Sequence, residues 1–136
     1  MKASLLVASA LLLGGCAAPA AAPRAAEAAS SLAGTSWVGV IDPAVDKNAV
    51  PRIEFAPGRL TGFTGCNMMS GAWSAEADAA RVSGVVATKR MCLGAGNDVE
   101  QRVLAALAAG SRVTRERDRL VFTSPSGARF EFTRAN

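Results

Sequence analysis

Residues 60–73, LTGFTGCNMMSGAW, do most to limit what this chain can fold into. Gly62 and Gly65 permit a β-bulge or the close approach of another backbone to a strand. Asn67 is a turn former, because its side chain can bond its own backbone and it tolerates a left-handed conformation. We therefore predict a strand that ends in a sharp corner, with Cys66 at that corner.

Short segments of alternating polar and apolar residues surround this stretch. Such alternation is typical of strands with one buried face, and it makes Trp37 a candidate core residue. Pro57 and Gly58 form a turn dipeptide between two of these segments, which indicates a hairpin. The last three segments predict a meander. The predicted strands span 35–41, 52–55, 59–65, 71–74, 81–88, 112–117, 120–124 and 128–133.

One segment, 97–109, has the pattern of a helix. Asn97 is a favourable N-cap with Glu100 three residues later, and Gly110 is suited to end the helix at the C′ position. Asp98 and Glu100 would add negative charge to the positive first turn. Its apolar residues recur at helical spacing and predict a stripe that lies on the sheet. The stripe consists of Val99, Val103, Leu104 and Leu107.

The N-terminus has the pattern of an export signal. Lys2 precedes an apolar run over 5–13, which is too short for a permanent membrane-spanning helix. Residues 13–16, Leu-Gly-Gly-Cys, resemble the bacterial lipobox. This resemblance implies cleavage before Cys16 and acylation of its sulfur and amino group, and two or more acyl chains anchor a protein stably. The alternative is an ordinary signal peptide with a chance cysteine.

The chain divides into three parts on this interpretation. Residues 1–15 are a lipoprotein signal peptide, and 16–31 are the lipidated Cys16 followed by an alanine- and proline-rich tether. Residues 32–136 form one domain, which is long enough to bury a core without a metal. Ala17 after the cysteine suggests sorting to the outer membrane. We predict a protein on the periplasmic side of the bacterial envelope, with the membrane as a partner through Cys16.

Composition excludes several classes of function. The chain has no histidine and no tyrosine, which removes Ser-His-Asp and Cys-His catalysis, imidazole zinc sites and phenolate chemistry. We expect no metal and no cofactor. The net charge of +4 is a mild excess that we interpret as solubility, and we expect no nucleic-acid partner.

Cys66 and Cys92 remain if Cys16 is lipidated. Exported proteins meet an oxidising compartment where disulfides persist, so we favour a structural disulfide. Two free core thiols, a redox pair or a metal pair are the alternatives. With this bridge, Asn67 and the glycines would form a stapled corner. In a second interpretation, Asn67, Ser70 and Thr88 are ligand-binding groups around the mouth of a pocket.

Two neighbouring features carry weaker predictions. Met68 and Met69 could form an adaptable contact surface, with at least one of them in the core. Lys89 and Arg90 belong to a basic loop that could contact lipid phosphates or a partner, although a solvated connection is the more common explanation.

The ordered motifs resemble the META domain, also called the HslJ-like domain. That family carries G-x-x-G-C-N, then S-G with an aromatic residue two places on, then T-x-x-x-C. The resemblance covers about 32–134 and implies an α+β fold: a mainly antiparallel, barrel-like curved sheet of about seven or eight strands with one helix packed across it. It implies no catalytic residue. The matching residues are Gly62, Gly65, Cys66, Asn67, Ser70, Gly71, Trp73, Thr88 and Cys92.

The resemblance also implies an association with heat stress and novobiocin resistance. We predict a non-enzymatic envelope lipoprotein that binds another envelope component, either a protein or a lipid. The alternative is a lipid-anchored inhibitor of a secreted hydrolase such as lysozyme. Such inhibitors carry an S-G-x-x-aromatic loop, from which residues 70–73 differ in having the aromatic only two residues after glycine. An enzyme that uses two carboxylates is a third hypothesis, but Asp98 and Glu100 are better explained as helix-start charges.

Overall fold

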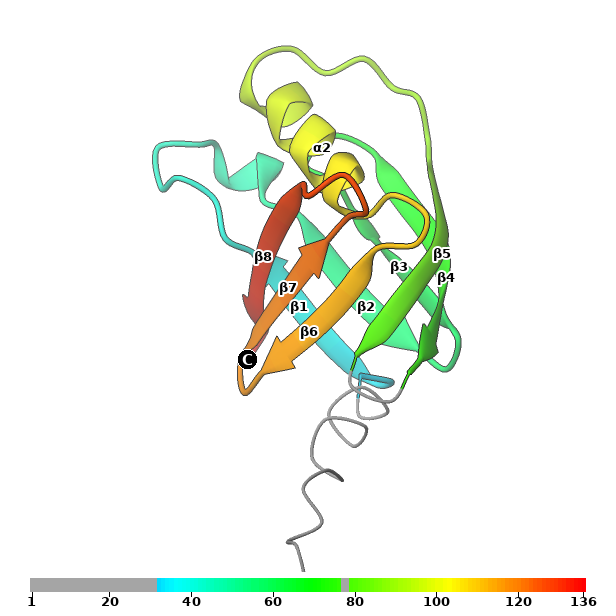
Figure 1. The fold of residues 1–136 in the computed structure, drawn as a ribbon. Coiled ribbons are helices and arrows are strands. Elements are labelled where there is room, and N and C mark those ends of the chain that lie inside the picture. Colours follow the sequence, from blue (N-terminus) through cyan, green and yellow to red (C-terminus); the bar gives the residue numbers. More distant parts are fainter. Residues whose placement is uncertain (1–31, 77–78) are drawn as a thin grey trace, which may run out of the picture.

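A computed structural model describes residues 32–76 and 79–136, and these form a closed antiparallel barrel with one helix across it (Figure 1). The predicted signal peptide, Cys16 and the tether lie outside the described residues. In the described ranges each strand pairs with its sequence neighbours, and β1 closes the barrel on β8. The strands are β1 (Thr35–Gly39), β2 (Arg52–Ala56), β3 (Arg59–Phe63), β4 (Met68–Ala75), β5 (Ala80–Ala87), β6 (Arg112–Glu116), β7 (Arg119–Thr123) and β8 (Arg129–Arg134).

Up-and-down topology gives the barrel two distinct ends. We call one the entry end, because the described chain starts there at Leu32, ahead of β1 (Figure 1). The Pro57-Gly58 turn of the β2–β3 hairpin also lies there. The other we call the corner end, since it holds residues 64–67 between β3 and β4. The 88–94 loop and α2 (Ala95–Ala106), which together connect β5 to β6, also lie at the corner end.

The inside of the barrel is filled by the apolar side of each strand. In β2, for example, buried and exposed residues alternate, and Ile53 and Phe55 are the buried residues that point into the barrel. Aromatic rings interlock in this core, with Phe55 edge-on to Trp73 at 5.5 Å and Phe122 edge-on to Phe132 at 5.5 Å. The largest fully buried side chains are Trp37, Phe122, Phe132, Leu32, Ile53, Leu60, Leu107 and Leu120.

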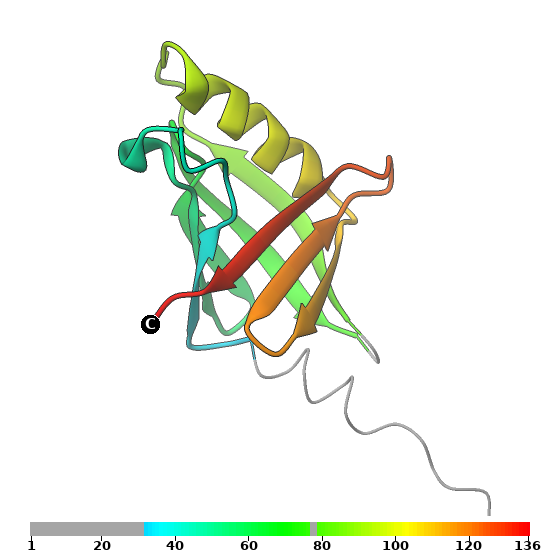
Figure 2. The same ribbon diagram turned by 90° about the vertical axis from the view of Figure 1, so that its left-hand side faces the viewer.

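Helix α2 covers the open corner end of the barrel (Figure 2). Val99, Val103 and Leu107 of the predicted stripe are fully buried, and Leu104 at its margin is half-buried. No helix within 32–76 and 79–136 has the length and apolar character needed to cross a membrane. The α+β barrel with one packed helix therefore agrees with the sequence-based prediction.

The strands around the corner differ from their predicted bounds. β3 stops at Phe63, so Gly65 lies in the turn and not in a strand as predicted. β4 begins at Met68, three residues before its predicted start. The reason is a tight turn, in which the Thr64 N–H donates to the Asn67 carbonyl at 2.8 Å and brings the chain straight back.

The helix also begins and ends earlier than predicted. Gly94, with φ 74°, is its N-cap, and the Asn97 side chain makes no capping bond. The Leu107 N–H donates to the Val103 carbonyl at the end of the helix. Gly110 is therefore not the C′ residue; its N–H donates to the Val82 carbonyl at 2.8 Å and leads the chain into β6. Glycine at 94, which tolerates positive φ, starts the helix before the better capping residue is reached.

Candidate functional site: the disulfide corner

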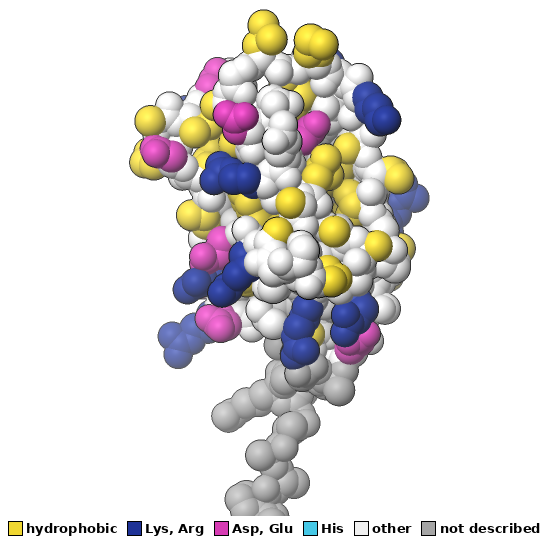
Figure 3. Space-filling view, turned by 45° about the horizontal axis from the view of Figure 1, so that its top comes forward, with side chains coloured by type: hydrophobic (Ala, Val, Ile, Leu, Met, Phe, Trp, Pro, Cys, Tyr) yellow, Lys and Arg dark blue, Asp and Glu magenta, His cyan; other side chains and the backbone are white. Residues whose placement is uncertain are grey.

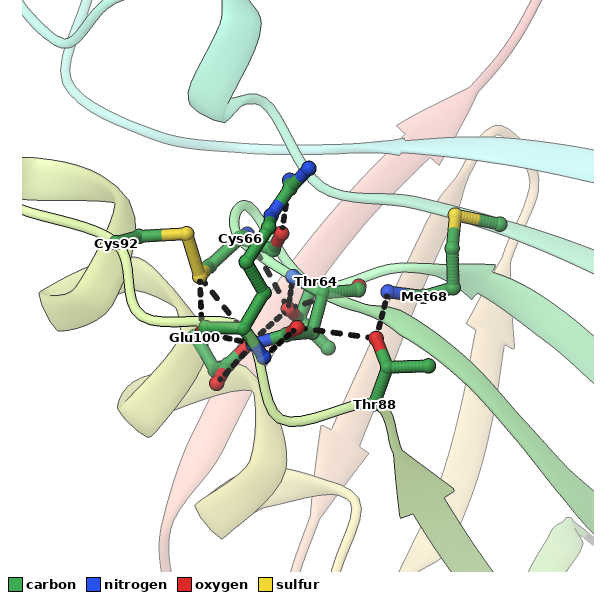
Figure 4. Close-up of a disulfide and its surroundings, with 8 residues drawn as sticks. Thr64, Cys66, Met68, Thr88, Cys92 and Glu100 are labelled. Atoms are coloured by element: carbon green, nitrogen blue, oxygen red, sulfur yellow. Dashed lines mark hydrogen bonds between the residues drawn. A yellow bond between two sulfur atoms is a disulfide. The ribbon is translucent and has the colours of Figure 1, made fainter.

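A disulfide joins Cys66 in the corner to Cys92 in the loop before α2 (Figure 4). Their Cα atoms lie 5.9 Å apart, and the two residues are 26 apart in sequence. Cys66 is buried, whereas Cys92 is half-buried. The bridge therefore fixes the start of the helix to the β3–β4 corner.

Asn67 is the polar centre of this corner. Its side-chain oxygen accepts from the Arg90 N–H at 2.7 Å and from the Thr88 hydroxyl at 3.0 Å. Its amide nitrogen lies 3.0 Å from the Arg90 carbonyl and 3.1 Å from each carboxylate oxygen of Glu100. The side chain thus pairs with a backbone segment as a strand neighbour would. It does not bond its own backbone, and its φ is not positive, so neither of the two properties that predict a turn at Asn67 is used.

Thr64 shapes the turn that was assigned to Asn67. Its hydroxyl oxygen accepts from the Asn67 N–H at 2.9 Å and from the Cys66 N–H at 3.3 Å. The same hydroxyl donates to the Glu100 carboxylate. Glu100 is therefore more than a helix-start charge. Its carboxylate accepts hydrogen bonds from Thr64 and Asn67 and so holds α2 against the corner (Figure 4).

The motif glycines lie where a side chain would collide with its neighbours. A Cβ at Gly62 would lie 2.1 Å from the Arg52 carbonyl oxygen, and one at Gly71 would lie 2.2 Å from the Gly84 oxygen. Gly65 has φ +108°, and its Cβ would lie 2.8 Å from the Ala49 oxygen. The predicted close backbone approach holds at Gly62, while at Gly65 the turn conformation adds a second requirement for glycine.

The remaining motif residues lie at different depths. Trp73 is buried on Phe55, and its indole N–H is shared between the Ala56 carbonyl at 2.9 Å and the Arg59 carbonyl at 3.1 Å. Ser70 is half-buried in β4. The structure brings Asn67 and Thr88 together, but Ser70 and Trp73 lie farther along β4.

The methionines and basic residues next to the corner also differ in burial and in their contacts. Met69 is 3% exposed and belongs to the core, whereas Met68 is 59% exposed. Lys89 and Arg90 are both exposed, yet the Arg90 guanidinium donates to the Cys66 carbonyl at 2.8 Å. Of the two basic residues that could contact a partner, Arg90 therefore already forms a hydrogen bond within the corner.

The buried polar groups of the corner form hydrogen bonds within the protein. Throughout 32–76 and 79–136, every buried side-chain nitrogen and oxygen has a hydrogen-bond partner. The same ranges hold no group of three or more His, Cys, Asp or Glu side chains that could bind a metal ion. What the corner can do is hold β3, β4, the 88–94 loop and α2 in one arrangement.

Local sequence patterns do not assign two members of this network, because Thr64 is an unspecified position of G-x-x-G-C-N and Glu100 belongs to the helix-start pattern. Their side chains meet although they are 36 residues apart. No local pattern relates them. The one available signal was a threonine next to the G-C-N motif, a residue type that often stabilises turns through its hydroxyl.

The fold and its stapled corner define a class: small antiparallel barrel domains with one capping helix. The META domain family model matches residues 30–136, so the chain belongs to the META domain family. An NMR structure of a protein from Burkholderia xenovorans matches with a TM-score of 0.64 and 20% identity, covering 98% of this chain and 95% of that chain. A second NMR structure matches with a TM-score of 0.62 and 18% identity, covering 76% and 92%. No curated protein matches.

Proposed function

We propose that this META-domain protein is a lipid-anchored, non-enzymatic component of the bacterial envelope that binds another envelope component. The export signal with its cysteine and tether supports the location. The corner supports a role without chemistry, because its polar groups are bound to one another and not directed at a substrate. Tolerance of heat and of novobiocin is the physiological role that we assign to this binding.

One observation carries the binding role. Among the described residues, the large hydrophobic side chains that remain exposed all lie near the corner end of the barrel. Figure 3 looks toward this end and shows hydrophobic side chains (yellow) across it, two of them standing out at its tip. Exposed apolar groups that gather on one part of a surface are typical of an interaction site. They are Val40 (51% exposed), Met68 (59%), Val86 (71%), Met91 (88%) and Leu93 (90%).

The position of this surface suits a lipid anchor at Cys16. The described chain starts at the entry end, at Leu32, whereas Met91 and Leu93 lie at the opposite end. A tether leaving the entry end would place the exposed apolar side chains away from the anchoring membrane. They would then face components of the periplasm.

A crosslinking pull-down from intact envelopes tests this role, with the full lipidated chain as bait. We expect the double substitution Met91→Ser and Leu93→Ser to reduce the crosslinked partner at least tenfold. Both side chains are solvent-exposed, so the fold should be unaffected. The matched control is Ala56→Ser with Ala75→Ser, two exposed alanines at the entry end, which should leave the yield unchanged. Equal yields from both variants would reject the corner end as the binding surface.

Deletion of the gene tests the physiological role separately. We expect lower survival after heat shock and a lower inhibitory concentration of novobiocin. A chain with Cys16→Ser should not restore either property, since it lacks the anchor. Unchanged heat tolerance and drug sensitivity in the deletion strain would remove the stress assignment.

A further inference from the structure

Strand β5 is paired along its whole length with β4 but only briefly with β6. The β5–β6 ladder consists of Ala80 with Val113 and Arg81 with Arg112. Val82 extends it by one step, because its N–H donates to the Ser111 carbonyl and its carbonyl accepts from the Gly110 N–H. After Val82, no residue of the described chain pairs with the second edge of β5.

A bulge decides which backbone groups face this open edge. The β4–β5 register shifts between Ala72 and Trp73, where Ser83 is the extra residue on β5. Val82 faces β6, yet the Thr88 N–H faces β4 and donates to the Met68 carbonyl at 2.9 Å. Backbone direction alternates along a strand, so the groups of Gly84 and Val86 face β4 beyond the bulge.

The N–H and C=O groups of Val85 and Ala87 consequently point away from β4. Within 32–76 and 79–136 neither residue has a neighbouring strand on that side. Val85 and Ala87 are successive unpaired positions on the same edge of β5. The spacing of their N–H and C=O groups allows an extended chain to form hydrogen bonds with both. The side chains of Val85 and Ala87 pack against the core, so this edge is held in place from within.

A groove of about 470 Å³ continues from this edge toward α2. Leu104 of α2 and Met91 supply apolar side chains to its lining, and the exposed Lys89 adds a positive charge. The other two charged side chains of the lining already form hydrogen bonds within the protein. The Glu100 carboxylate accepts from Asn67 and Thr64, and the Arg90 guanidinium donates to the Cys66 carbonyl. The complete lining is Asn67, Ala87, Thr88, Lys89, Arg90, Met91, Glu100 and Leu104.

We propose that this groove takes an extended segment of another polypeptide, which pairs as an added strand with Val85 and Ala87 of β5. It rests on the binding role proposed above and names the class of partner. An unpaired strand edge selects extended backbone, and flanking apolar groups select alternate apolar side chains. Lys89 favours an acidic residue at the end of the segment nearest the 88–94 loop.

Hydrogen exchange tests the open edge in the full chain, purified in detergent and observed by NMR. We expect the amides of Val85 and Ala87 to exchange at least a hundredfold faster than those of Gly84 and Val86, which bond to β4. Equal protection of all four amides would show that the edge is closed, and it would overturn the proposal.

Peptide binding tests the occupant. The probe is a ten-residue peptide that alternates valine with threonine and ends in glutamate, with blocked termini. N-methylation of either all valines or all threonines removes the N–H groups along one edge only. We expect one methylated peptide to bind at least tenfold more weakly and the other to bind within threefold of the parent. Equal loss from both, or no binding by the parent peptide, would reject strand addition.

Substitutions in the protein give a second measurement. Ala87→Pro removes an edge N–H and should weaken peptide binding at least tenfold, whereas Ala75→Ser changes only an exposed side chain at the entry end and should leave affinity unchanged. Lys89→Gln should weaken binding of the glutamate peptide but not of its glutamine version. If Ala87→Pro disturbs folding, the methylated peptides still decide the question.

A second copy of this chain is the other occupant that the edge could take. Sedimentation would then show a concentration-dependent dimer that the peptide dissociates, and this result would overturn a foreign segment as the partner. A failure of all peptides, with Met91 and Leu93 still required for the pull-down, would reject the strand edge. The binding role itself would stand.

Discussion

Asn67 shows how one side chain can hold separate segments together. Its amide group bonds the Arg90 backbone at both N–H and C=O, and it also reaches Thr88 and Glu100. Since Asn67 is only 2% exposed, water cannot replace these bonds. The residue therefore acts as a connector between the corner, the 88–94 loop and α2.

Asn67→Ala should lower the free energy of unfolding by about 2 to 4 kcal/mol, because it leaves several buried groups without partners. Urea unfolding of the oxidised protein measures this change. Asn97→Ala is the matched control, since the Asn97 side chain makes no capping bond. We expect that control to change stability by at most about 0.5 kcal/mol. Equal losses from the two substitutions would mean that Asn67 is not the connector described here.

Alanine substitutions at Gly65 and Gly84 compare a position that requires glycine with one that does not. Gly65→Ala should cost more than about 2 kcal/mol, because it combines a positive φ with a contact of 2.8 Å to the Val99 side chain. Gly84→Ala should be within about 0.5 kcal/mol of the parent, since a Cβ there meets nothing within 4 Å. Thermal unfolding of both variants measures the difference. A tolerated alanine at position 65 would contradict the strained turn.

At the scale of elements, the disulfide and α2 act together. The bridge holds the loop that precedes α2, and the buried face of α2 then closes the corner end of the barrel. The Glu100 carboxylate adds a second attachment one turn into the helix. The start of α2 is therefore fixed at two points.

Replacing both cysteines, Cys66→Ala with Cys92→Ala, should reduce the free energy of unfolding by about 3.5 kcal/mol. This figure follows from the chain entropy of closing a loop between residues 26 apart. Urea unfolding compares this variant with the oxidised parent, and a reducing agent should lower the parent by a similar amount. A variant as stable as the parent would show that the corner holds without its bridge.

The same elements show what the sequence could predict. Alternation located β2 and the β6–β8 meander within about a residue, because a half-buried strand imprints its period on the sequence. The helix stripe was predicted for the same reason. The start of α2 was not, because Gly94 and the disulfide act there, and the local capping rule favoured Asn97. The role of Glu100 does not follow from its local pattern, because its partner Thr64 follows the end of β3, 36 residues away in sequence.

The whole molecule is a barrel whose two ends are built differently. The entry end receives the chain from the N-terminal segment at Leu32, and it is held by short turns. The corner end carries the disulfide, α2, the exposed apolar side chains and the open edge of β5. The motif residues thus support the proposed binding surface from beneath. Of the motif residues, Asn67 and Thr88 also line the groove beside β5.

Site-specific photocrosslinking in intact envelopes tests this division most directly. A photoreactive residue is placed in the full lipidated chain at Met91 or Leu93, or at Ala56 or Asp118 of the entry end. We expect crosslinked partners from the two corner-end positions and none from the two entry-end positions. Partners captured from Ala56 and Asp118, with none from Met91 and Leu93, would contradict the account.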